Sequence, residues 1–429
     1  MNGLSIKPIN CHQCPDCYEA KIVNAEWNIG RVMATLREYD GIRREWKKRN
    51  PKQGNLSPHS IHGGEPLLLK FNDLHELLRY NYSMFGRSGI QTNLLYINKK
   101  HIDLFKRYNT SVGISFDGHL GYMNKGRFPD SKGDIIKRGL AKILRNMGKL
   151  KSAGISMSII SMLRECNSGV SDILEFMYFV KDEYDINHMR FTACTIYNPD
   201  NKAAEISPIK LFGIYSAIFS SGVENDGMSV APINEFVDGM MGHIGNMSCS
   251  SKDCDPWRST AEITAMGNGE LGSCLHAGGS LDGLQIQRGD ISSHERSDVL
   301  KQIPQESGGC SDCKFWHMCK GGCPGQAINN DWRNKTRFCL GLKMTFNHIY
   351  DKLKSLFPNI YLTPDFYPDL PDAEYIKKSI SKSVNRRCDK IASPKAKGKE
   401  WVPIIENGIS HQDSNNQEWL KLNPGWGEK

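Results

Sequence analysis

The sequence predicts an α/β fold with a parallel sheet in its first half and a cysteine-rich segment after it. Between residues 1 and 215, short apolar stretches alternate with amphipathic stretches of helical periodicity, in about six units. This alternation is typical of βα units that build a parallel sheet. From about residue 242 the periodicity fades, and Cys, Gly and Ser dominate. Such a segment cannot build a large apolar core, so we expect bound metal to organise it.

The order of the elements follows from where the apolar runs begin and end. Runs rich in aliphatic residues predict strands at 60–62, 90–97, 111–116, 155–163 and 188–196. The first run leads into Gly63 and Gly64, and the third ends at Asp117 and Gly118, pairs that favour turns. Apolar residues at helical spacing predict helices at 74–84, 135–150, 170–180 and 346–356.

Length and charge exclude several classes of protein. The 429 residues suggest two or three domains, and no run approaches the roughly 18 apolar residues of a membrane helix. The first residues lack the apolar stretch of a secretory signal, so we expect a cytoplasmic protein that does not bind a membrane. The net charge of +8 is mildly basic, which is compatible with a nucleic-acid or acidic-peptide partner.

The 14 cysteines are the strongest chemical signal. Disulfides are disfavoured in a reducing compartment, so clustered cysteines indicate metal binding. The first cluster, Cys11-x2-Cys14-x2-Cys17, offers three thiolates without a nearby fourth. Such a set can bind three irons of one 4Fe–4S cluster and leave the fourth iron open to a small molecule. The alternative is a structural zinc site that takes a further ligand such as His12.

Three later segments accompany this cluster: HGGEP at 62–66, QTN at 91–93 and GISFDG at 113–118. In order and spacing, the chain resembles the radical S-adenosylmethionine (radical SAM) superfamily over roughly residues 5–200. The resemblance implies a partial, TIM-like (β/α)6 barrel with a 4Fe–4S cluster and SAM at the carboxyl ends of its strands. One departure is the cysteine spacing, because the family usually has C-x3-C-x2-C.

The resemblance also implies roles for single residues. The three cysteines of the first cluster would hold the SAM-binding 4Fe–4S cluster. Gly63, Gly64 and Glu65 match the motif at the SAM amine, and Ser115 and Arg127 match positions near its carboxylate and ribose. Arginine suits a carboxylate because its guanidinium can donate two parallel hydrogen bonds. Each feature also has a plainer interpretation, since a glycine pair is often a turn and a single arginine is often only solvated.

A second array of cysteines lies beyond residue 242. It reads Cys254-x14-Gly269-x4-Cys274, then Cys310-x2-Cys313-x5-Cys319-x3-Cys323, then Cys339, with Cys249 as an eighth thiol. This pattern resembles the SPASM domain, which implies two auxiliary 4Fe–4S clusters. By that resemblance, one cluster takes Cys249, Cys254, Cys274 and Cys323, and the other takes Cys310, Cys313, Cys319 and Cys339. A pair of structural zinc sites is the alternative.

The remaining cysteines, Cys166, Cys194 and Cys388, fit neither pattern and are expected to be free thiols. We therefore expect three parts: a radical SAM partial barrel at 1–220, a SPASM domain at 242–345, and a helix with a basic, partly disordered tail at 346–429.

The implied activity is that of a radical SAM oxidoreductase or isomerase. Reductive cleavage of SAM, driven by a donor such as flavodoxin or ferredoxin, would give a 5′-deoxyadenosyl radical that removes hydrogen from the substrate. Anaerobic sulfatase-maturing enzymes carry an Asp base directly after the cysteine that matches Cys274, whereas Leu275 and His276 follow here. This difference argues against sulfatase maturation and leaves His276 as a candidate base.

The substrate is the least determined feature. Most enzymes of this resemblance modify peptide or protein side chains, which makes that class the first expectation. A barrel that begins near residue 1 leaves no leader-peptide domain before it, which argues against a ribosomal-peptide maturase. The basic run at 377–399, the stretch at 43–52 and the tryptophans at 401, 419 and 426 favour a modified nucleic-acid base, with a small molecule as a third option. A zinc-binding nucleic-acid scaffold without catalysis is the non-enzyme alternative.

Overall fold

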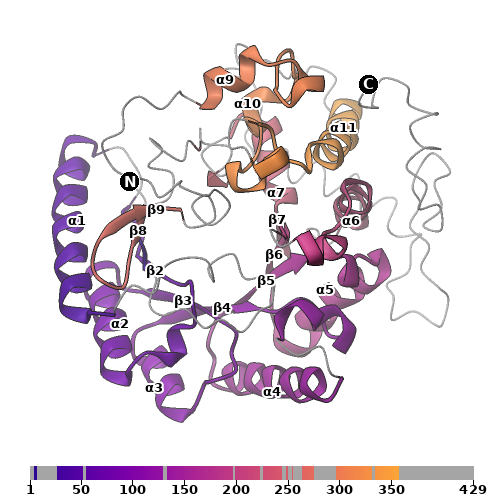
Figure 1. Cartoon of the computed structure of the whole chain (residues 1–429). Coiled ribbons are helices and arrows are strands. Elements are labelled where there is room, and N and C mark those ends of the chain that lie inside the picture. The colour runs from indigo at the N-terminus through magenta and orange to yellow at the C-terminus, as the bar shows by residue number, and fades with distance from the viewer. Residues whose placement is uncertain are drawn as a thin grey trace.

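The computed structural model describes most of the first 356 residues. The described ranges are 4–6, 27–51, 55–128, 133–196, 199–222, 226–243, 248–249, 254, 263–274, 296–330 and 334–356. Figure 1 shows a curved sheet lined on its outer side by helices, with three further helices, α9, α10 and α11, across the opening of the curve.

A single curved sheet of nine strands forms the centre of the fold, in the order β7-β6-β5-β4-β3-β2-β1-β8-β9. Every neighbouring pair from β7 to β8 is parallel, and β9 alone runs antiparallel to β8. The strands are β1 (Ser5–Ile6), β2 (Ser60–Ile61), β3 (Ser88–Thr92), β4 (Thr110–Ser115), β5 (Met157–Leu163), β6 (His188–Ala193), β7 (Ser229–Ala231), β8 (Ile263–Ala265) and β9 (Leu271–Ser273). The first six strands follow one another in both sequence and space, as a partial barrel requires.

A helix follows each of these first six strands. These helices are α1 (Ile29–Arg49), α2 (Phe71–Phe85), α3 (Lys99–Arg107), α4 (Gly133–Ser152), α5 (Val170–Tyr184) and α6 (Pro208–Ser221). The later helices are α7 (Ile233–Met240), α9 (Arg296–Gln302), α10 (Trp316–Cys319) and α11 (Cys339–Leu356). The expected α/β fold with six βα units is confirmed. Helix α6 illustrates the local signals: Ser207 accepts from the Lys210 amide at 3.2 Å, Pro208 opens the helix, and Gly222 ends it at φ 68°.

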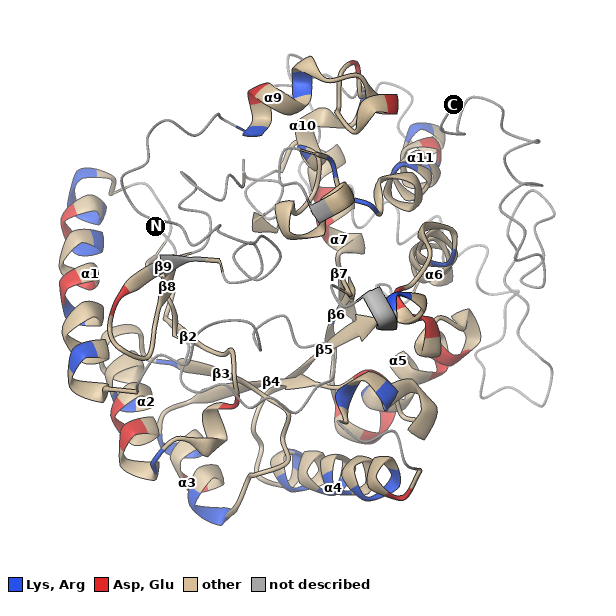
Figure 2. Ribbon diagram, viewed as in Figure 1, with Lys and Arg blue, Asp and Glu red and all other residues tan. Residues whose placement is uncertain are grey.

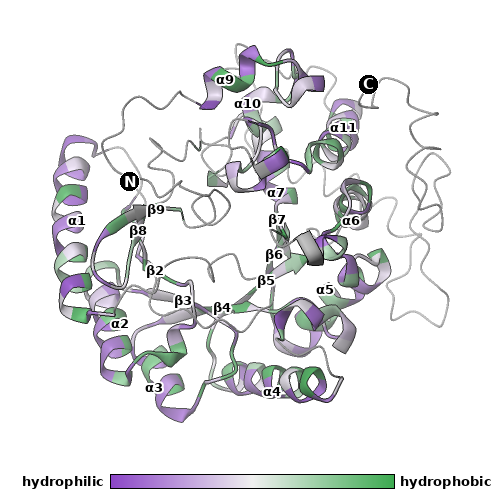
Figure 3. Ribbon diagram, viewed as in Figure 1, coloured by the Kyte–Doolittle hydropathy of each residue, from purple (hydrophilic) through white to green (hydrophobic). Residues whose placement is uncertain are grey.

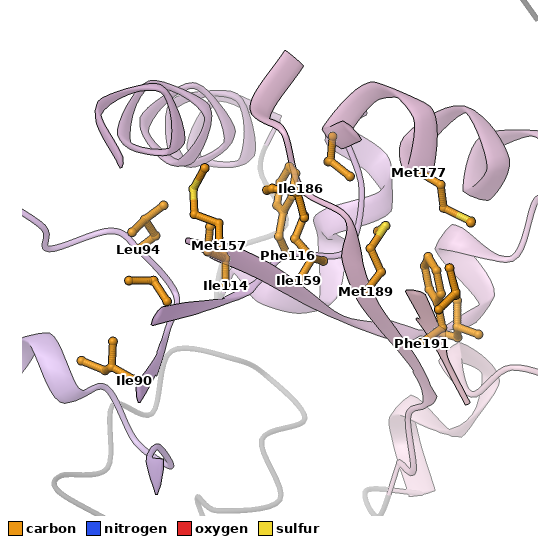
Figure 4. Packing of buried hydrophobic residues seen from close by; sticks show 14 of the residues in the cluster. Ile90, Leu94, Ile114, Phe116, Met157, Ile159, Met177, Ile186, Met189 and Phe191 are labelled. Atoms are coloured by element: carbon orange, nitrogen blue, oxygen red, sulfur yellow. The ribbon is translucent and has the colours of Figure 1, made fainter. Parts of the chain in front are cut away.

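The core lies between the sheet and the outer helices. Along β3 to β6 every second residue is buried, which places one face of each strand against the helices. Figure 4 shows Ile114, Phe116 and Ile159 on that side of the strands, in one apolar cluster with Met177 and Met189. Figure 3 shows the matching pattern on the helices, where hydrophobic and hydrophilic residues alternate along α4 and α5.

A buried polar network fastens β1 to the rest of the barrel. The Leu4 amide donates to Nδ1 of His59 at 2.9 Å, and Nε2 of His59 lies 3.0 Å from Oδ2 of Asp40. Because Nδ1 accepts a hydrogen bond, the proton of a neutral His59 is on Nε2 and points to Asp40. Arg43 and Tyr80 donate to the same carboxylate at 2.8 Å each. The strand that precedes residues 11–17 is therefore held at a fixed place.

The cysteine-rich half contributes to the barrel sheet. Strand β8 pairs with β1 and continues the parallel sheet, and its hairpin with β9 packs against α1. Gly269, in the turn of this hairpin, has φ 85°, and a Cβ there would lie 2.7 Å from Cβ of Arg31. Only glycine fits this contact, which explains the glycine of the second cysteine pattern. At the other end, α11 lies beside α6.

The expected and observed boundaries differ by a few residues in several elements and by more in two of them. The strand expected at 90–97 ends at Thr92, because Thr92 and Asn93 turn toward the carboxylate of Glu65. The helix expected at 346–356 begins earlier, at Cys339. In the described part of the chain, no helix is both long and apolar enough to cross a membrane.

Candidate active site and metal centres

On the concave face of the sheet, strands β3 and β4 carry small or neutral residues. On β3 and β4 the half-buried positions that alternate with the core are occupied by Gly89, Gln91, Gly113 and Ser115. The amide of Gln91 donates to Oγ of Ser115 at 3.2 Å, which confirms that both side chains share this face. Figure 2 shows that charged residues of both signs lie mainly on the outer helices. Small and neutral side chains thus leave room at the carboxyl ends of the central strands.

The loop after β2 contains the predicted glycine pair. Gly63 and Gly64 have φ values of 85° and 63°, a backbone conformation that favours glycine. The next residue, Glu65, is almost fully buried, and its carboxylate accepts from Thr92 Oγ1 at 2.6 Å, Asn93 N at 2.8 Å and Leu67 N at 3.0 Å. Burial raises the pKa of Glu65, whereas these hydrogen bonds oppose the rise. The structure therefore gives Glu65 a local task, which is to lock this loop onto the end of β3.

Arg127 lies at the neighbouring strand ends. Its Nη2 donates to Oδ1 of Asp117 at 2.6 Å and to the carbonyl of Ile160 at 3.3 Å. The same carboxylate oxygen accepts from the Met162 amide at 2.8 Å. The other oxygen of Asp117 is buried and has no hydrogen-bond partner among the described residues. An acceptor with spare capacity thus lies at the end of β4, beside Ser115.

The first predicted set of four auxiliary thiols comes together in space. Cys254 is buried, and its closest electrostatic neighbours include the thiols of Cys323, Cys249 and Cys274. Burial raises the pKa of the Cys254 thiol well above its ordinary value, and the three other thiols raise it further. Cys274 directly follows β9, so the hairpin on α1 delivers one of the four sulfurs.

The second set converges in the same way. Burial raises the pKa of the Cys310 thiol to about 12, with further contributions from Cys339 and Cys313. The pKa of Cys319 is also raised well above its ordinary value by burial and by those three thiols. All four line one pocket with about 310 Å³ of empty space, part of it open to solvent. Aromatic and aliphatic side chains complete the lining: Phe315, Trp316, Leu342 and Phe346.

The spacing of these thiols bears on which metal they suit. The four thiols of each group lie close enough to alter one another's pKa or to line one pocket. Four soft thiolates around a space lined in part by apolar side chains fit an iron–sulfur cluster, which takes four cysteine ligands.

Several predicted residues fall outside the described part of the chain. They are the cysteines of the first cluster (Cys11, Cys14 and Cys17), the candidate base His276, the free thiol Cys388, the basic run at 377–399 and the three C-terminal tryptophans. Of the other two cysteines expected to be free, Cys194 is buried and Cys166 is half-buried, and neither forms a disulfide.

Comparison with known proteins places these features in a wider context. No family model matches the chain. A cysteine-type anaerobic sulfatase-maturating enzyme of Clostridium novyi is 24% identical over 386 residues, which cover 82% of this chain and 97% of that protein. A serine-type anaerobic sulfatase-maturating enzyme of Bacteroides thetaiotaomicron is 22% identical over 325 residues, 67% of this chain and 74% of that protein.

Solved structures show the same architecture. The enzyme anSMEcpe with bound AdoMet matches with a TM-score of 0.60 and 18% identity, over 84% of this chain and 100% of that one. Its complex with AdoMet and the Cp18Cys peptide matches with a TM-score of 0.59 and 18% identity, over 83% and 99%. The match spans both the barrel and the segment that carries the two groups of four cysteines. In sequence and in fold, the chain thus resembles radical SAM enzymes with a SPASM domain.

The comparisons confirm the expected fold, and the solved relatives bind AdoMet, the cofactor expected from the sequence. The described residues fit two auxiliary clusters, since eight thiols form two groups of four. Sequence reasoning did not single out two residues of this candidate site. Asp117, which holds Arg127, was visible only as the end of a strand, and Arg296, which lies among the thiols, belongs to no motif.

Proposed function

We propose that this chain is a radical SAM enzyme that modifies a side chain of a peptide or protein. The supporting observation is the match to sulfatase-maturating enzymes along 82% of this chain, together with a structural neighbour that binds a peptide. When bound, SAM and its reduced cluster supply the radical that removes hydrogen from an unactivated C–H bond. The task of the protein is to bind both partners, to orient the reacting carbon and to exclude water.

The cofactor contacts proposed from the sequence divide into two kinds. Gly63, Gly64, Ser115 and Arg127 lie at the carboxyl ends of β2 to β4 and are proposed to contact SAM. Glu65 is proposed to act through the loop instead, because three donors already occupy its carboxylate. Cys11, Cys14 and Cys17 are proposed as ligands of the SAM cluster, at the end of a segment that starts from the fastened strand β1.

The eight cysteines of the second array are proposed as the ligands of the auxiliary clusters. Cys249, Cys254, Cys274 and Cys323 would hold one, and Cys310, Cys313, Cys319 and Cys339 would hold the other. A thiol must lose its proton to bind iron, so the raised pKa values of Cys254, Cys310, Cys319 and Cys323 mean that cluster assembly releases protons from these sites.

We do not extend the proposal to sulfatases. Leu275 and His276 follow Cys274, where sulfatase-maturing enzymes are expected to have an acidic base. The nucleic-acid alternative also has less support than the sequence suggested. Within the basic stretch at 43–52, Arg43 is fully buried and paired with Asp40, and Lys47 and Lys48 lie in the last turn of α1, where cations stabilise a helix.

A turnover assay tests the proposed substrate class. Anaerobically reconstituted enzyme would be incubated with SAM, dithionite and one of three probes: a tryptic peptide pool, the Cp18Cys peptide, or duplex DNA. We expect the peptide pool to increase 5′-deoxyadenosine formation and one peptide in it to change mass. A Cys17→Ala variant, which lacks one proposed cluster ligand, serves as the inactive control. Stimulation by DNA alone, or by no probe at all, would contradict the proposal.

A further inference from the structure

Arg296 is the most deeply buried charge near the cysteine groups. It opens α9, and its residue is only 2% exposed. An isolated guanidinium in such a place would cost several kcal/mol of desolvation. A buried arginine therefore needs compensation, and the structure supplies it from two segments of backbone.

The first segment is the loop that joins the two groups of thiols. Nη1 of Arg296 donates to the carbonyls of Lys320 and Gly322 at 3.2 and 3.0 Å, and Nη2 donates to that of Gly321 at 3.3 Å. This loop has Cys319 on one side and Cys323 on the other. Because these two cysteines belong to different groups of four, the loop is the shortest covalent link between the two proposed cluster sites.

The second segment is the approach to Cys339. Nη2 also donates to the carbonyl of Asn334 at 3.2 Å, and the Thr336 amide donates to the Gly321 carbonyl at 2.8 Å. One guanidinium thus ties together the backbone next to Cys319, Cys323 and Cys339. Truncation of this side chain would leave these carbonyls without their shared donor.

The loop at residues 320–322 has an unusual backbone conformation, which the hydrogen bonds from Arg296 stabilise. Lys320, Gly321 and Gly322 have φ values of 47°, 77° and 72°, three consecutive left-handed residues. A Cβ on Gly321 would lie 2.5 Å from Cδ1 of Leu300, and one on Gly322 would lie 2.6 Å from Cγ2 of Thr336. The two glycines let three carbonyls turn toward one side, and that side is where Arg296 lies.

The charge of Arg296 lies close to both groups of sulfurs. The Cβ position of Gly321 is 3.4 Å from Nη2 of Arg296 and 3.5 Å from Sγ of Cys310, so those two atoms are at most about 7 Å apart. The charge of Arg296 interacts electrostatically with Cys254 and Cys323 of the first group, and with Cys310 and Cys319 of the second. Another buried cation, Lys335, lies near Cys310 and lines the pocket of the second group.

We propose that Arg296 is a positioning residue shared by the two auxiliary clusters, which joins their binding loops and raises both reduction potentials through its buried positive charge. The inference depends on the proposed assignment of the eight cysteines to two clusters. A cluster with four thiolate ligands gains negative charge on reduction. A cation held at short range in a poorly solvated site stabilises the reduced form more than the oxidised form. Net charge and hydrogen bonding near the sulfurs are known controls of cluster potential.

Two substitutions separate the positioning role from the charge. Arg296→Gln removes the charge and keeps a donor amide, so we expect both auxiliary clusters to assemble with potentials shifted to more negative values. Arg296→Lys keeps the charge but loses the planar fork. We expect it to retain potentials near those of the wild type, with lower cluster occupancy. Lys335→Gln is the matched control, and it should shift only the cluster of the second group.

The measurement is a redox titration of the reconstituted holoenzyme followed by electron paramagnetic resonance, with iron and sulfide content determined on each sample. Cys254→Ala and Cys313→Ala variants assign the two auxiliary signals. If these variants lose no cluster, the ligand assignment fails. If the assignment holds and Arg296→Gln leaves both potentials unchanged, the inference about Arg296 fails by itself. An Arg296→Lys protein whose potentials shift as far as those of Arg296→Gln would also overturn the inference, because the charge would then not be the cause.

Discussion

The guanidinium of Arg127 donates a 2.6 Å hydrogen bond to Asp117, and the Asp117 side chain is fully buried while that of Arg127 is 16% exposed. The pair connects the end of β4 to the segment after it, and the Met162 amide adds the end of β5. Arg127 is therefore oriented before any ligand arrives. A preoriented arginine loses less conformational entropy on binding a carboxylate.

This pairing predicts different effects for its two members. Asp117→Asn leaves a buried cation without its counter-charge, so we expect a loss of about 3 kcal/mol in the free energy of unfolding. Arg127→Lys keeps the charge and removes the fork, so we expect a folded protein whose Kd for SAM rises about tenfold. Urea unfolding and equilibrium dialysis measure the two effects. An unchanged SAM affinity in Arg127→Lys would restrict Arg127 to its pairing with Asp117.

The second prediction concerns the lock on the glycine loop. In Glu65→Gln an amide nitrogen replaces one oxygen and faces a donor, either the Thr92 hydroxyl or the amide of Asn93 or Leu67. A buried unsatisfied group of this kind costs about 1–3 kcal/mol, so the urea midpoint should fall accordingly. Glu76→Gln is the control, because its 3.8 Å pair with Arg37 is exposed and should contribute little. If the urea midpoint fell equally in both variants, the hydrogen bonds of Glu65 would stabilise the protein no more than the Glu76–Arg37 pair does.

The third prediction is a pH dependence of stability that arises at His119. Its ring stacks on Phe176 and Phe179, with centroids 6.2 and 5.1 Å away. Burial lowers the pKa of His119 below its ordinary value of 6.5, although the carboxylates of Glu175 and Asp172 oppose this shift. As the pH falls through 6.5, the unfolded chain binds a proton that the folded chain does not, so stability is lost on the acid side.

His119→Phe keeps the aromatic stack and removes the titration. We expect the variant to be more stable relative to the wild type at about pH 5.5 than at about pH 7.5, as judged by urea midpoints. A gap between His119→Phe and the wild type that does not change with pH would contradict the assigned cause.

Much of the barrel could be predicted from the sequence because its signals are local. The strand at 111–116 was visible from its aliphatic run and from the turn residues that follow it, and the structure has β4 at Thr110–Ser115. Strand β3 was predicted too long because its end is set by Glu65, a residue 27 positions before Thr92. A hydrogen bond from a side chain in another loop does not change the local hydrophobic periodicity, so it could not be predicted from that periodicity.

The candidate site also contains features that the sequence predicted and features that it did not. The cysteine spacings identified both groups of thiols, because thiols at fixed intervals are rare unless they share a ligand. The strand β8 was missed, since three residues cannot show a pattern and its partner β1 is more than 250 positions away. Arg296 was missed because a single arginine in a polar segment looks like a solvated one. Its role follows only from a loop that folds three carbonyls toward it.

The last prediction is the metal content of the whole enzyme. Three 4Fe–4S clusters require about 12 iron and about 12 sulfide per chain after anaerobic reconstitution. Cys14→Ala should lower both values to about 8, because the two auxiliary sites use other cysteines as ligands. The substitution should also abolish SAM cleavage.

The iron count is most informative for the first cysteine cluster, because the spacing of Cys11, Cys14 and Cys17 is one residue shorter than usual for the family. About 8 iron in the wild type, unchanged in Cys14→Ala, would show that the short loop holds no cluster, whereas zinc without sulfide would restore the scaffold interpretation.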